Sequence, residues 1–306
     1  MYTFVARLTQ KPARLARVRR WGRWVPRSLV VGGCWLLAMG GMLFVPNLRR
    51  QVSANIQIGT ASPDGSLRLA IAHIAHLLLT FYEIVVDVAH LDERKIAWFR
   101  WSGVNHVEAA LAQGRGVILF APHLGNFFFA YWCLCQRFNC LTVGTASSPE
   151  LRPLYETFYA LGCGGLDYDA TPPREMVRTL RRHLAQNGVV LLLGDFWRSS
   201  FPAATLLDQV SRSPQGAAVF ALDDGVPIVP FYAVRSGRQH NLVFAPALDL
   251  RCRFARHERR AATDALNVWL TSIIRQYPAQ WFYWFNVHER WAARPITGGS
   301  EQMAVG

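Results

Sequence analysis

The 306-residue sequence predicts an α/β fold in which helices flank a mixed central sheet, preceded by a membrane-anchoring helix near the N-terminus. Two observations lead to this prediction. After Trp101, short apolar segments alternate with segments of helical period, and this alternation is typical of α/β sandwiches. Nearer the N-terminus, a basic arm directly precedes an uncharged apolar run. We therefore expect a basic arm at 1–27, an anchor helix at 28–46, a helical connector at 47–100, an α/β domain at 101–297 and a tail at 298–306.

The arm and the apolar run together predict contact with lipid. Much of the formal net charge of +13 lies in the first 27 residues, and neither Asp nor Glu occurs before Asp64. The run from Ser28 to Pro46 carries no charge and is about long enough to cross a bilayer core as a helix. Such a run beside a basic arm favours anionic lipid over nucleic acid as the partner. The eight basic residues of the arm are Arg7, Lys11, Arg14, Arg17, Arg19, Arg20, Arg23 and Arg27.

The orientation of this anchor has two readings. A cleaved signal peptide is disfavoured, because the basic region is long and no small-x-small cleavage site follows the apolar run. The other alternative to a membrane anchor is a buried amphipathic hairpin. The arm itself predicts a cytoplasmic N-terminus. Arg49 and Arg50 make the second flank of the run positive as well. A shallow or strongly tilted helix, with both ends near the cytoplasmic face, is compatible with both flanks.

A second apolar stretch, Leu67 to Leu91, has the ionisable side chains of His73, His76, Glu83 and Asp87 embedded in it and is predicted to be a long helix packed on the core or lying at the membrane. Those side chains argue against a second membrane span. His73 and His76 share one helix face, with Glu83 two turns further on, so a metal site is one alternative. A helix with a polar side explains the same residues without a ligand.

The α/β part consists of short strands rich in Val, Ile, Leu and Phe, with helical periods between them. Two helices are expected to end before strands at Asn187-Gly188 and Asp224-Gly225, because glycine readily ends a helix. The predicted strands are 116–121, 141–145, 189–193, 227–233 and 242–245. The predicted helices are 107–113, 127–137, 153–161, 173–187, 214–224 and 257–276.

A histidine follows the first of these strands. His123 stands where the strand at 116–121 becomes a loop, and a Gly-Asn pair and an aromatic run come directly after it. A histidine in such a place can act as general base on a hydroxyl. The alternative is a structural histidine whose nitrogens are satisfied by neighbours.

The stretch His123-Leu-Gly125-Asn126-Phe127-Phe128 resembles the active-site block of the lipid A late acyltransferases, a branch of the lysophospholipid acyltransferase superfamily. These enzymes carry His-x-x-x-x-Glu or Asp after a strand, often as His-x-Gly-Asn-Trp-Glu. The histidine, Gly-Asn and aromatic positions match, but Phe128 stands where the family has its acid. The resemblance implies that His123 is the catalytic base. Asp195, at the end of another strand, is our candidate for the missing acid.

Later blocks extend the resemblance in the same order along the chain. Residues 189–198 look like the family's strand and Asp-Gln-Asp, of which only Asp195 is retained, and 225–235 look like its Pro-Val-Val-Pro strand with a trailing arginine. Residues 211–216 resemble the family's turn that leads into a helix. The backbone N–H groups at the start of such a helix, together with Arg212, could bind an anion. Residues 277–284 match its Pro-Glu-Gln-Trp segment. The substrate-binding residues that this implies are Gly125, Asn126, Phe128, Arg198, Arg212, Gly216 and Arg235; for the arginines, ordinary surface charge is the alternative.

The implied function is transfer of a fatty acyl chain from an acyl thioester to a hydroxyl of a lipid or glycolipid. The resemblance implies acyl carrier protein or coenzyme A as the carrier of the acyl group, and a basic surface suits an acidic carrier. It implies no metal, no redox cofactor and no nucleic acid. The implied location is the cytoplasmic side of a bacterial inner membrane. Phe128 supports the alternative, a catalytically impaired homologue that binds lipid or forms a complex.

Overall fold

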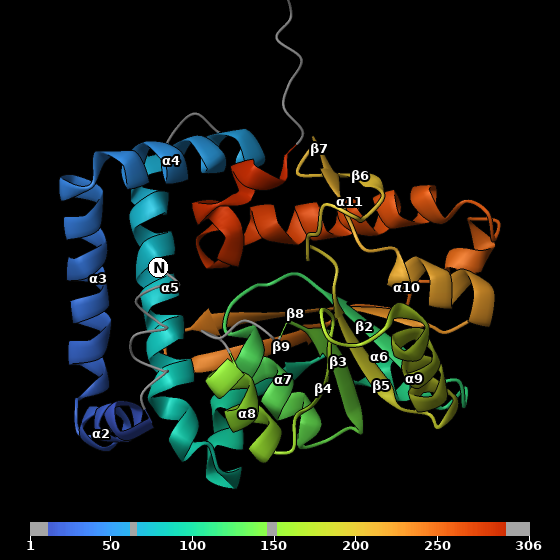
Figure 1. The fold of residues 1–306 in the computed structure, drawn as a ribbon, viewed down its shortest axis with the longest axis horizontal. Helices are drawn as coiled ribbons and strands as arrows, with labels where there is room; N and C mark the ends of the chain where they lie inside the picture. Colours follow the sequence, from blue (N-terminus) through green and yellow to red (C-terminus); the bar gives the residue numbers. More distant parts are fainter. Residues whose placement is uncertain (1–11, 62–65, 146–151, 292–306) are drawn as a thin grey trace, which may run out of the picture.

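The computed structural model describes residues 12–61, 66–145 and 152–291, and its centre is a seven-stranded sheet. The strand order is β1-β9-β8-β2-β5-β3-β4, and only β8 and β9 pair antiparallel. The sheet is therefore mixed and helices cover both faces (Figure 1), which confirms the predicted fold class. The strands are β1 (Phe99–Ser102), β2 (Val117–Ala121), β3 (Cys140–Gly144), β4 (Gly164–Asp167), β5 (Val189–Leu193), β8 (Ile228–Ser236) and β9 (Gln239–Phe244).

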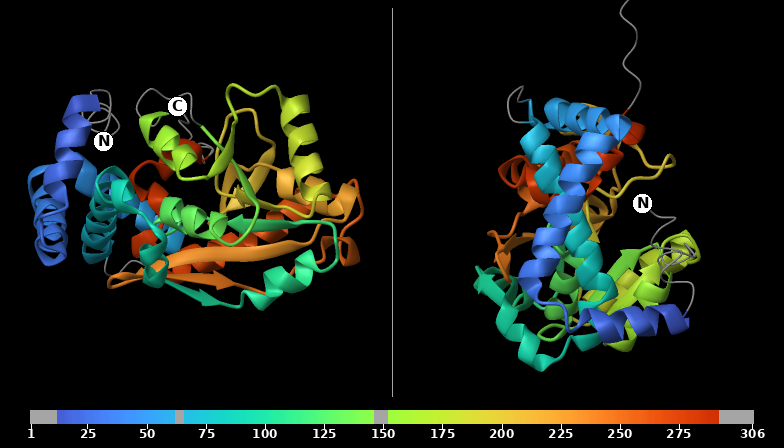
Figure 2. Two further views of the ribbon diagram at one scale, coloured as in Figure 1. Left: turned by 90° about the horizontal axis from the view of Figure 1, so that it is seen from below. Right: turned by 90° about the vertical axis from the view of Figure 1, so that its left-hand side faces the viewer.

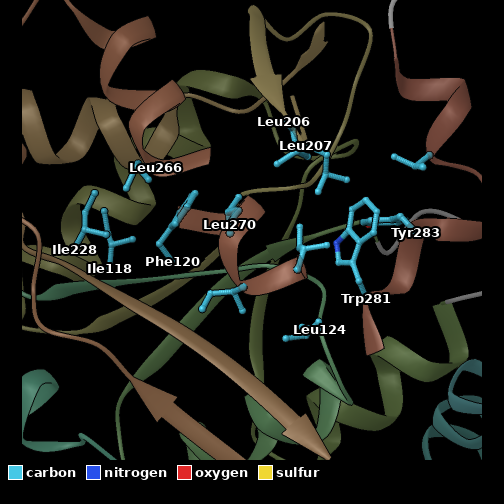
Figure 3. Close-up of a cluster of buried hydrophobic side chains, with 14 of the residues drawn as sticks. Ile118, Phe120, Leu124, Leu206, Leu207, Ile228, Leu266, Leu270, Trp281 and Tyr283 are labelled. Carbon is cyan, nitrogen blue, oxygen red and sulfur yellow. The ribbon is translucent and has the colours of Figure 1, made fainter. Parts of the chain in front are cut away.

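The surroundings of the central strand β2 explain why its sequence is apolar throughout. All five of its residues are buried, since helices lie on both sides of it. Successive side chains point to opposite faces: Ile118 and Phe120 pack in one hydrophobic cluster, and Leu119 packs in the other. Figure 3 shows the first cluster, where Phe120 lies near Leu270 of the long C-terminal helix.

Helices from different parts of the chain form the two outer layers. The first cluster includes residues of α9 (Pro173–Ala185), α10 (Gly216–Val219) and α11 (Arg259–Gln276). The second includes residues of α6 (Asn105–Leu111), α7 (Phe127–Cys135) and α8 (Arg152–Ala160). The carboxyl ends of β2 and β5 thus emerge between two packed layers.

Four N-terminal helices lie together beside the sheet: α2 (Pro12–Gly22), α3 (Arg27–Phe44), α4 (Pro46–Thr60) and α5 (Ser66–Val85). Residues of α3, α4 and α5 pack in the first cluster. In Figures 1 and 2, α3 and α5 lie side by side, α4 crosses one end of the pair, and α5 is the one next to the α/β part. Among the described residues, α3 and α5 are the two helices long and apolar enough to cross a membrane, by length and composition.

Several elements differ from the sequence prediction. Strands β1 and β4 and the hairpin β6 (Ala203–Leu206) with β7 (Gln209–Arg212) were not predicted. The helix expected at 214–224 begins at Gly216, and its second half, Phe220–Asp224, is a π-helical turn. β4 was missed because two of its four residues are glycine, so it has no apolar run to recognise.

Candidate active site

His123 and Asp195 are brought together by the register of two neighbouring strands. β2 and β5 are parallel, and Ala121 at the end of one pairs with Leu193 at the end of the other. His123 and Asp195 each lie two residues beyond these paired ends. They therefore emerge side by side at the carboxyl edge of the sheet, where α/β proteins commonly place their sites.

The predicted contact between them is present. The Nδ1 atom of His123 lies 2.7 Å from Oδ1 of Asp195, and the His123 backbone N–H donates to Oδ2 of the same carboxylate at 2.9 Å. The indole N–H of Trp281 donates to Oδ2 at 2.7 Å. Asp195 is buried, and no carboxylate is needed from position 128 to make this contact.

These donors keep Asp195 ionised despite its burial. Burial disfavours the charge and raises the pKa of the carboxyl, but His123 and the hydrogen bonds from His123 and Trp281 outweigh it, so the pKa lies below its usual value. A carboxylate at this place accepts the proton on Nδ1. The neutral imidazole then has its free lone pair on Nε2, which is the atom a general base uses.

The other nitrogen of His123 faces the C-terminal segment. The hydroxyl of Tyr283, in the turn Phe282–Phe285, lies 3.1 Å from Nε2. The guanidinium of Arg290 lies over the Tyr283 ring, 3.4 Å from its centroid, and Nη1 of Arg290 donates to the backbone oxygen of Asp195 at 3.3 Å. Backbone contacts hold this segment against the site, because the Phe282 N–H donates to the His123 carbonyl at 2.9 Å.

The Gly-Asn pair shapes the turn that carries His123. Gly125 has φ +61°, and a Cβ there would lie 2.4 Å from the backbone oxygen of Ala233, so no larger residue fits. The side-chain oxygen of Asn126 accepts the Phe129 N–H at 3.0 Å and so caps α7. Both residues lie outside the lining of the cavity described next.

A cavity of about 870 Å³ lies beside His123. Phe128 is part of its wall, half-buried, and stacks on Phe158 with ring centroids 5.4 Å apart. Arg198 and Gly216 also line it; Arg198 pairs with Asp169 at 3.0 Å. Apolar side chains that line it include Phe120, Phe127, Phe158, Leu180, Leu191, Leu192, Phe196, Phe201 and Phe220.

Two predicted substrate-binding arginines lie outside the cavity lining. Arg212 ends β7 and donates to the backbone oxygen of Phe201 at 2.7 Å. The side chain of Arg235, near the end of β8, is buried and paired with Glu83 of α5, with Nη2 to Oε2 at 2.6 Å. Of the arginines predicted to bind substrate, Arg198 is the one at the cavity.

Glu83 also connects the site to the N-terminal helices. Its Oε2 accepts from the side-chain amide of Asn126 at 2.8 Å, and Arg27, the first residue of α3, pairs with its Oε1. The sequence placed Glu83 on the polar side of a helix and gave no sign of these partners. Trp281 and Tyr283 were missed as site residues, although they lie in the matched segment 277–284. Arg290 lies after that segment and was missed as well.

The sequence is similar to that of known acyltransferases over most of its length. The profile of the bacterial lipid A biosynthesis acyltransferases matches residues 25–293. A phosphatidylinositol mannoside acyltransferase of Mycobacterium tuberculosis H37Rv is 31% identical over 188 residues, which are 58% of this chain and 56% of the relative's length. One of Mycolicibacterium smegmatis is 28% identical over 227 residues, covering 72% of this chain and 71% of the relative. The chain therefore belongs to the bacterial lipid A biosynthesis acyltransferase family.

Proposed function

We propose that this protein transfers a fatty acyl chain from a thioester to a hydroxyl of a membrane lipid or glycolipid, with His123 as general base and Asp195 as its acid. The observation that carries the proposal is the 2.7 Å contact between Nδ1 and Asp195 Oδ1 at the carboxyl edge of the sheet. It supplies the orienting carboxylate that Phe128 cannot supply.

The reaction follows from this arrangement. Nε2 takes the proton of the acceptor hydroxyl while that oxygen attacks the carbonyl carbon of the thioester. The tetrahedral intermediate then collapses, the C–S bond breaks, and the departing thiolate takes the proton from the imidazolium. Asp195 keeps the imidazole in the productive tautomer and stabilises the imidazolium, as the aspartate of the serine protease triad does for its histidine.

The cavity beside His123 suits the acyl chain. Most of its lining residues named above are apolar, and each buried methylene contributes about 0.8 kcal/mol to binding. Arg198 and the Gly216 end of α10 border the same cavity, and an arginine there suits a phosphate of coenzyme A or of an acyl carrier protein's prosthetic group. Because the relatives are phosphatidylinositol mannoside acyltransferases, that glycolipid is the first acceptor to try.

The outer face of α3 supports membrane attachment. Leu36, Leu37 and Leu43 are 67–68% exposed, whereas the opposite face packs against α5 through Val30, Cys34, Ala38 and Met42. Trp21 and Trp24, just before α3, are also exposed, as suits residues at a lipid interface.

The packing of α3 on α5 indicates how the helix meets the membrane. Because Arg27 and Asn126 both contact Glu83 of α5, α3 is tied to the active-site turn and does not project as an isolated helix. We therefore propose that α3 lies along the membrane surface, with both ends on the same side. The basic arm makes this the cytoplasmic side of a bacterial inner membrane.

The test is acyl transfer by the purified full chain in mixed micelles. Palmitoyl-coenzyme A and palmitoyl-acyl carrier protein are the donors, and phosphatidylinositol mannoside is the acceptor. The wild type and the control His257→Ala, a change at an exposed histidine, should form acylated lipid, and His123→Ala should form none. Turnover that survives in folded His123→Ala would overturn the mechanism. A folded wild type that binds palmitoyl-coenzyme A without transferring it would instead support the impaired, lipid-binding alternative.

A further inference from the structure

We propose that the outer face of α9 is the docking surface for an acidic acyl carrier protein, which presents its acyl thioester to the cavity beside this helix. The inference rests on the proposed acyl transfer and names the protein that delivers the acyl group. It begins from three exposed arginines, Arg174, Arg178 and Arg182, which follow one another at intervals of four residues along α9. These three residues are called the α9 stripe below.

The spacing of the arginines places them on one side of the helix. At 3.6 residues per turn, side chains four residues apart lie one above the other, so the α9 stripe is about 12 Å long. The buried side of α9 is the opposite one, where Met176, Leu180 and Leu184 pack in the first hydrophobic cluster. The stripe therefore faces solvent over most of the length of the helix.

The charge of the α9 stripe is not paired with carboxylates of the protein. In the part of the chain that the structure describes, none of the three arginines forms an ion pair, whereas the neighbouring Arg181 is paired with Asp224 at 2.7 Å. Glu175 is the one acidic residue in the sequence of α9. The stripe is therefore complementary to an acidic helix of a partner, on which carboxylates one turn apart have the same spacing.

Helix α9 also forms part of the rim of the cavity. Lining residues that are themselves exposed mark the place where the cavity meets solvent. Val177, on the flank of α9 beside the stripe, lines the cavity and is 38% exposed. Ala170, just before α9, and Tyr159 of α8 are also exposed lining residues. A thioester on a flexible prosthetic arm enters at this rim to reach His123, so its carrier protein lies against α9.

The length of the stripe favours a carrier protein over coenzyme A. An arginine suits a single phosphate, and Arg198 already lines the cavity, where it is available to the phosphate of either donor. Three arginines spread over about 12 Å on the outer side of a helix match a row of carboxylates better than a compact group of phosphates. An acidic carrier protein adds such a row to the same prosthetic arm.

The position of α9 argues against anionic lipid as the partner of the stripe. The exposed apolar face of α3 looks away from α5, because the other face of α3 packs on that helix. Figures 1 and 2 place α3 and α9 towards opposite ends of the molecule. A flat bilayer in contact with the outer face of α3 therefore does not reach the α9 stripe.

The test reverses the charge of the stripe in the full chain, with Arg174→Glu, Arg178→Glu and Arg182→Glu combined. Fluorescence anisotropy of labelled holo-acyl carrier protein measures binding in mixed micelles. The Kd should rise about 10- to 100-fold at low salt, because complementary charge mainly speeds association. The KM for palmitoyl-acyl carrier protein should rise by a similar factor, whereas the KM for palmitoyl-coenzyme A should not change.

A second triple variant is the matched control. It reverses three exposed arginines that lie outside α9 and outside the cavity lining, Arg94, Arg100 and Arg238. The net charge of the two triple variants is the same, so an effect of overall charge would appear in both. The control should bind the carrier protein as the wild type does, and thermal melting should show both variants folded.

Three results would overturn the inference and leave the proposed function standing. They are unchanged binding of the carrier protein by the folded stripe variant, equal losses with the two donors, and a wild type that transfers from palmitoyl-coenzyme A but does not bind the carrier protein. If the stripe variant instead lost binding to anionic vesicles in flotation, lipid would be the partner and the inference would also fail. Binding is measured without turnover, so a wild type that binds the carrier protein through the stripe but transfers no acyl chain would overturn the proposed function alone.

Discussion

Replacing Asp195 by Asn tests the geometry of the site most finely, because the two side chains have nearly the same shape. The carboxylate accepts three donors: Nδ1–H and the backbone N–H of His123, and the indole N–H of Trp281. An amide has one oxygen and one NH2 group, so it cannot accept at both positions. Whichever way the amide turns, one of these three hydrogen bonds cannot form while the imidazole keeps its proton on Nδ1.

Each orientation of the amide has a definite consequence. With the NH2 group toward His123, the amide donates to Nδ1, the ring proton moves to Nε2, and the base is in the wrong tautomer. With the oxygen toward His123, the NH2 group opposes the Trp281 N–H, and the imidazolium has no counter-charge. The equivalent change in the serine protease triad lowers kcat about 10⁴-fold, which is about 5.4 kcal/mol in the barrier.

We therefore expect Asp195→Asn to lower kcat by about 10³–10⁴-fold while KM for palmitoyl-coenzyme A stays within about threefold. The assay is initial-rate transfer of labelled palmitate to phosphatidylinositol mannoside, with thermal melting in the same micelles. Asp249→Asn is the control, since Asp249 is an exposed cap of a short helical turn outside the cavity lining. A kcat within tenfold of the wild type in a folded protein would refute the assignment of Asp195 as the orienting acid.

Other changes test the remaining parts of the structure. Phe128→Glu should lower kcat/KM without any gain in rate, because Asp195 already holds Nδ1 and the new charge would replace a ring stacked on Phe158; a faster enzyme would show that an acid is missing. Gly125→Ala should be destabilised by about 1–3 kcal/mol in urea denaturation, since its Cβ would lie 2.4 Å from a carbonyl oxygen, and a wild-type midpoint would contradict the turn. Changing Leu37 and Leu43 together to Ser should lower binding to anionic vesicles in flotation and leave micellar turnover unchanged; unchanged flotation would contradict the membrane face of α3. The pKa of Asp195 is lower in the folded protein than in the unfolded chain, so its ionisation stabilises the fold fully above about pH 4. This stabilisation is lost as the pH falls through the folded pKa. The melting temperatures of wild type and Asp195→Asn should therefore converge only below about pH 4.

The buried strands could be predicted because a parallel strand covered on both faces is an uninterrupted apolar run. β5 was expected at 189–193 and is found at Val189–Leu193. The same reasoning explains why Asp195 could be proposed as the acid partner of His123 before their distance was known, since both residues follow predicted buried strands. β1 and β4 lie at the two edges of the sheet, where side chains are less buried and the apolar pattern is weaker.

The polar partners of the site could not be predicted in the same way. Trp281 and Tyr283 reach the site through short turns about 160 residues after His123, and nothing in the local sequence states which way their polar atoms point. Arg235 follows a strand much as Asp195 does, yet its guanidinium is buried against Glu83 of α5. A charge at a strand end can face the cavity or a neighbouring helix, and only the packing of that helix decides between them.

The most direct test of the central claim is a double-mutant cycle on His123 and Asp195. If Asp195 acts only by orienting and stabilising the imidazole, it has nothing to act on once the imidazole is gone, and the losses are strongly non-additive. Single-turnover transfer from palmitoyl-coenzyme A should then be as slow in the double variant His123→Ala, Asp195→Asn as in His123→Ala alone. Losses that multiply in the double variant, with all proteins folded, would show that the two residues act independently and would contradict the account.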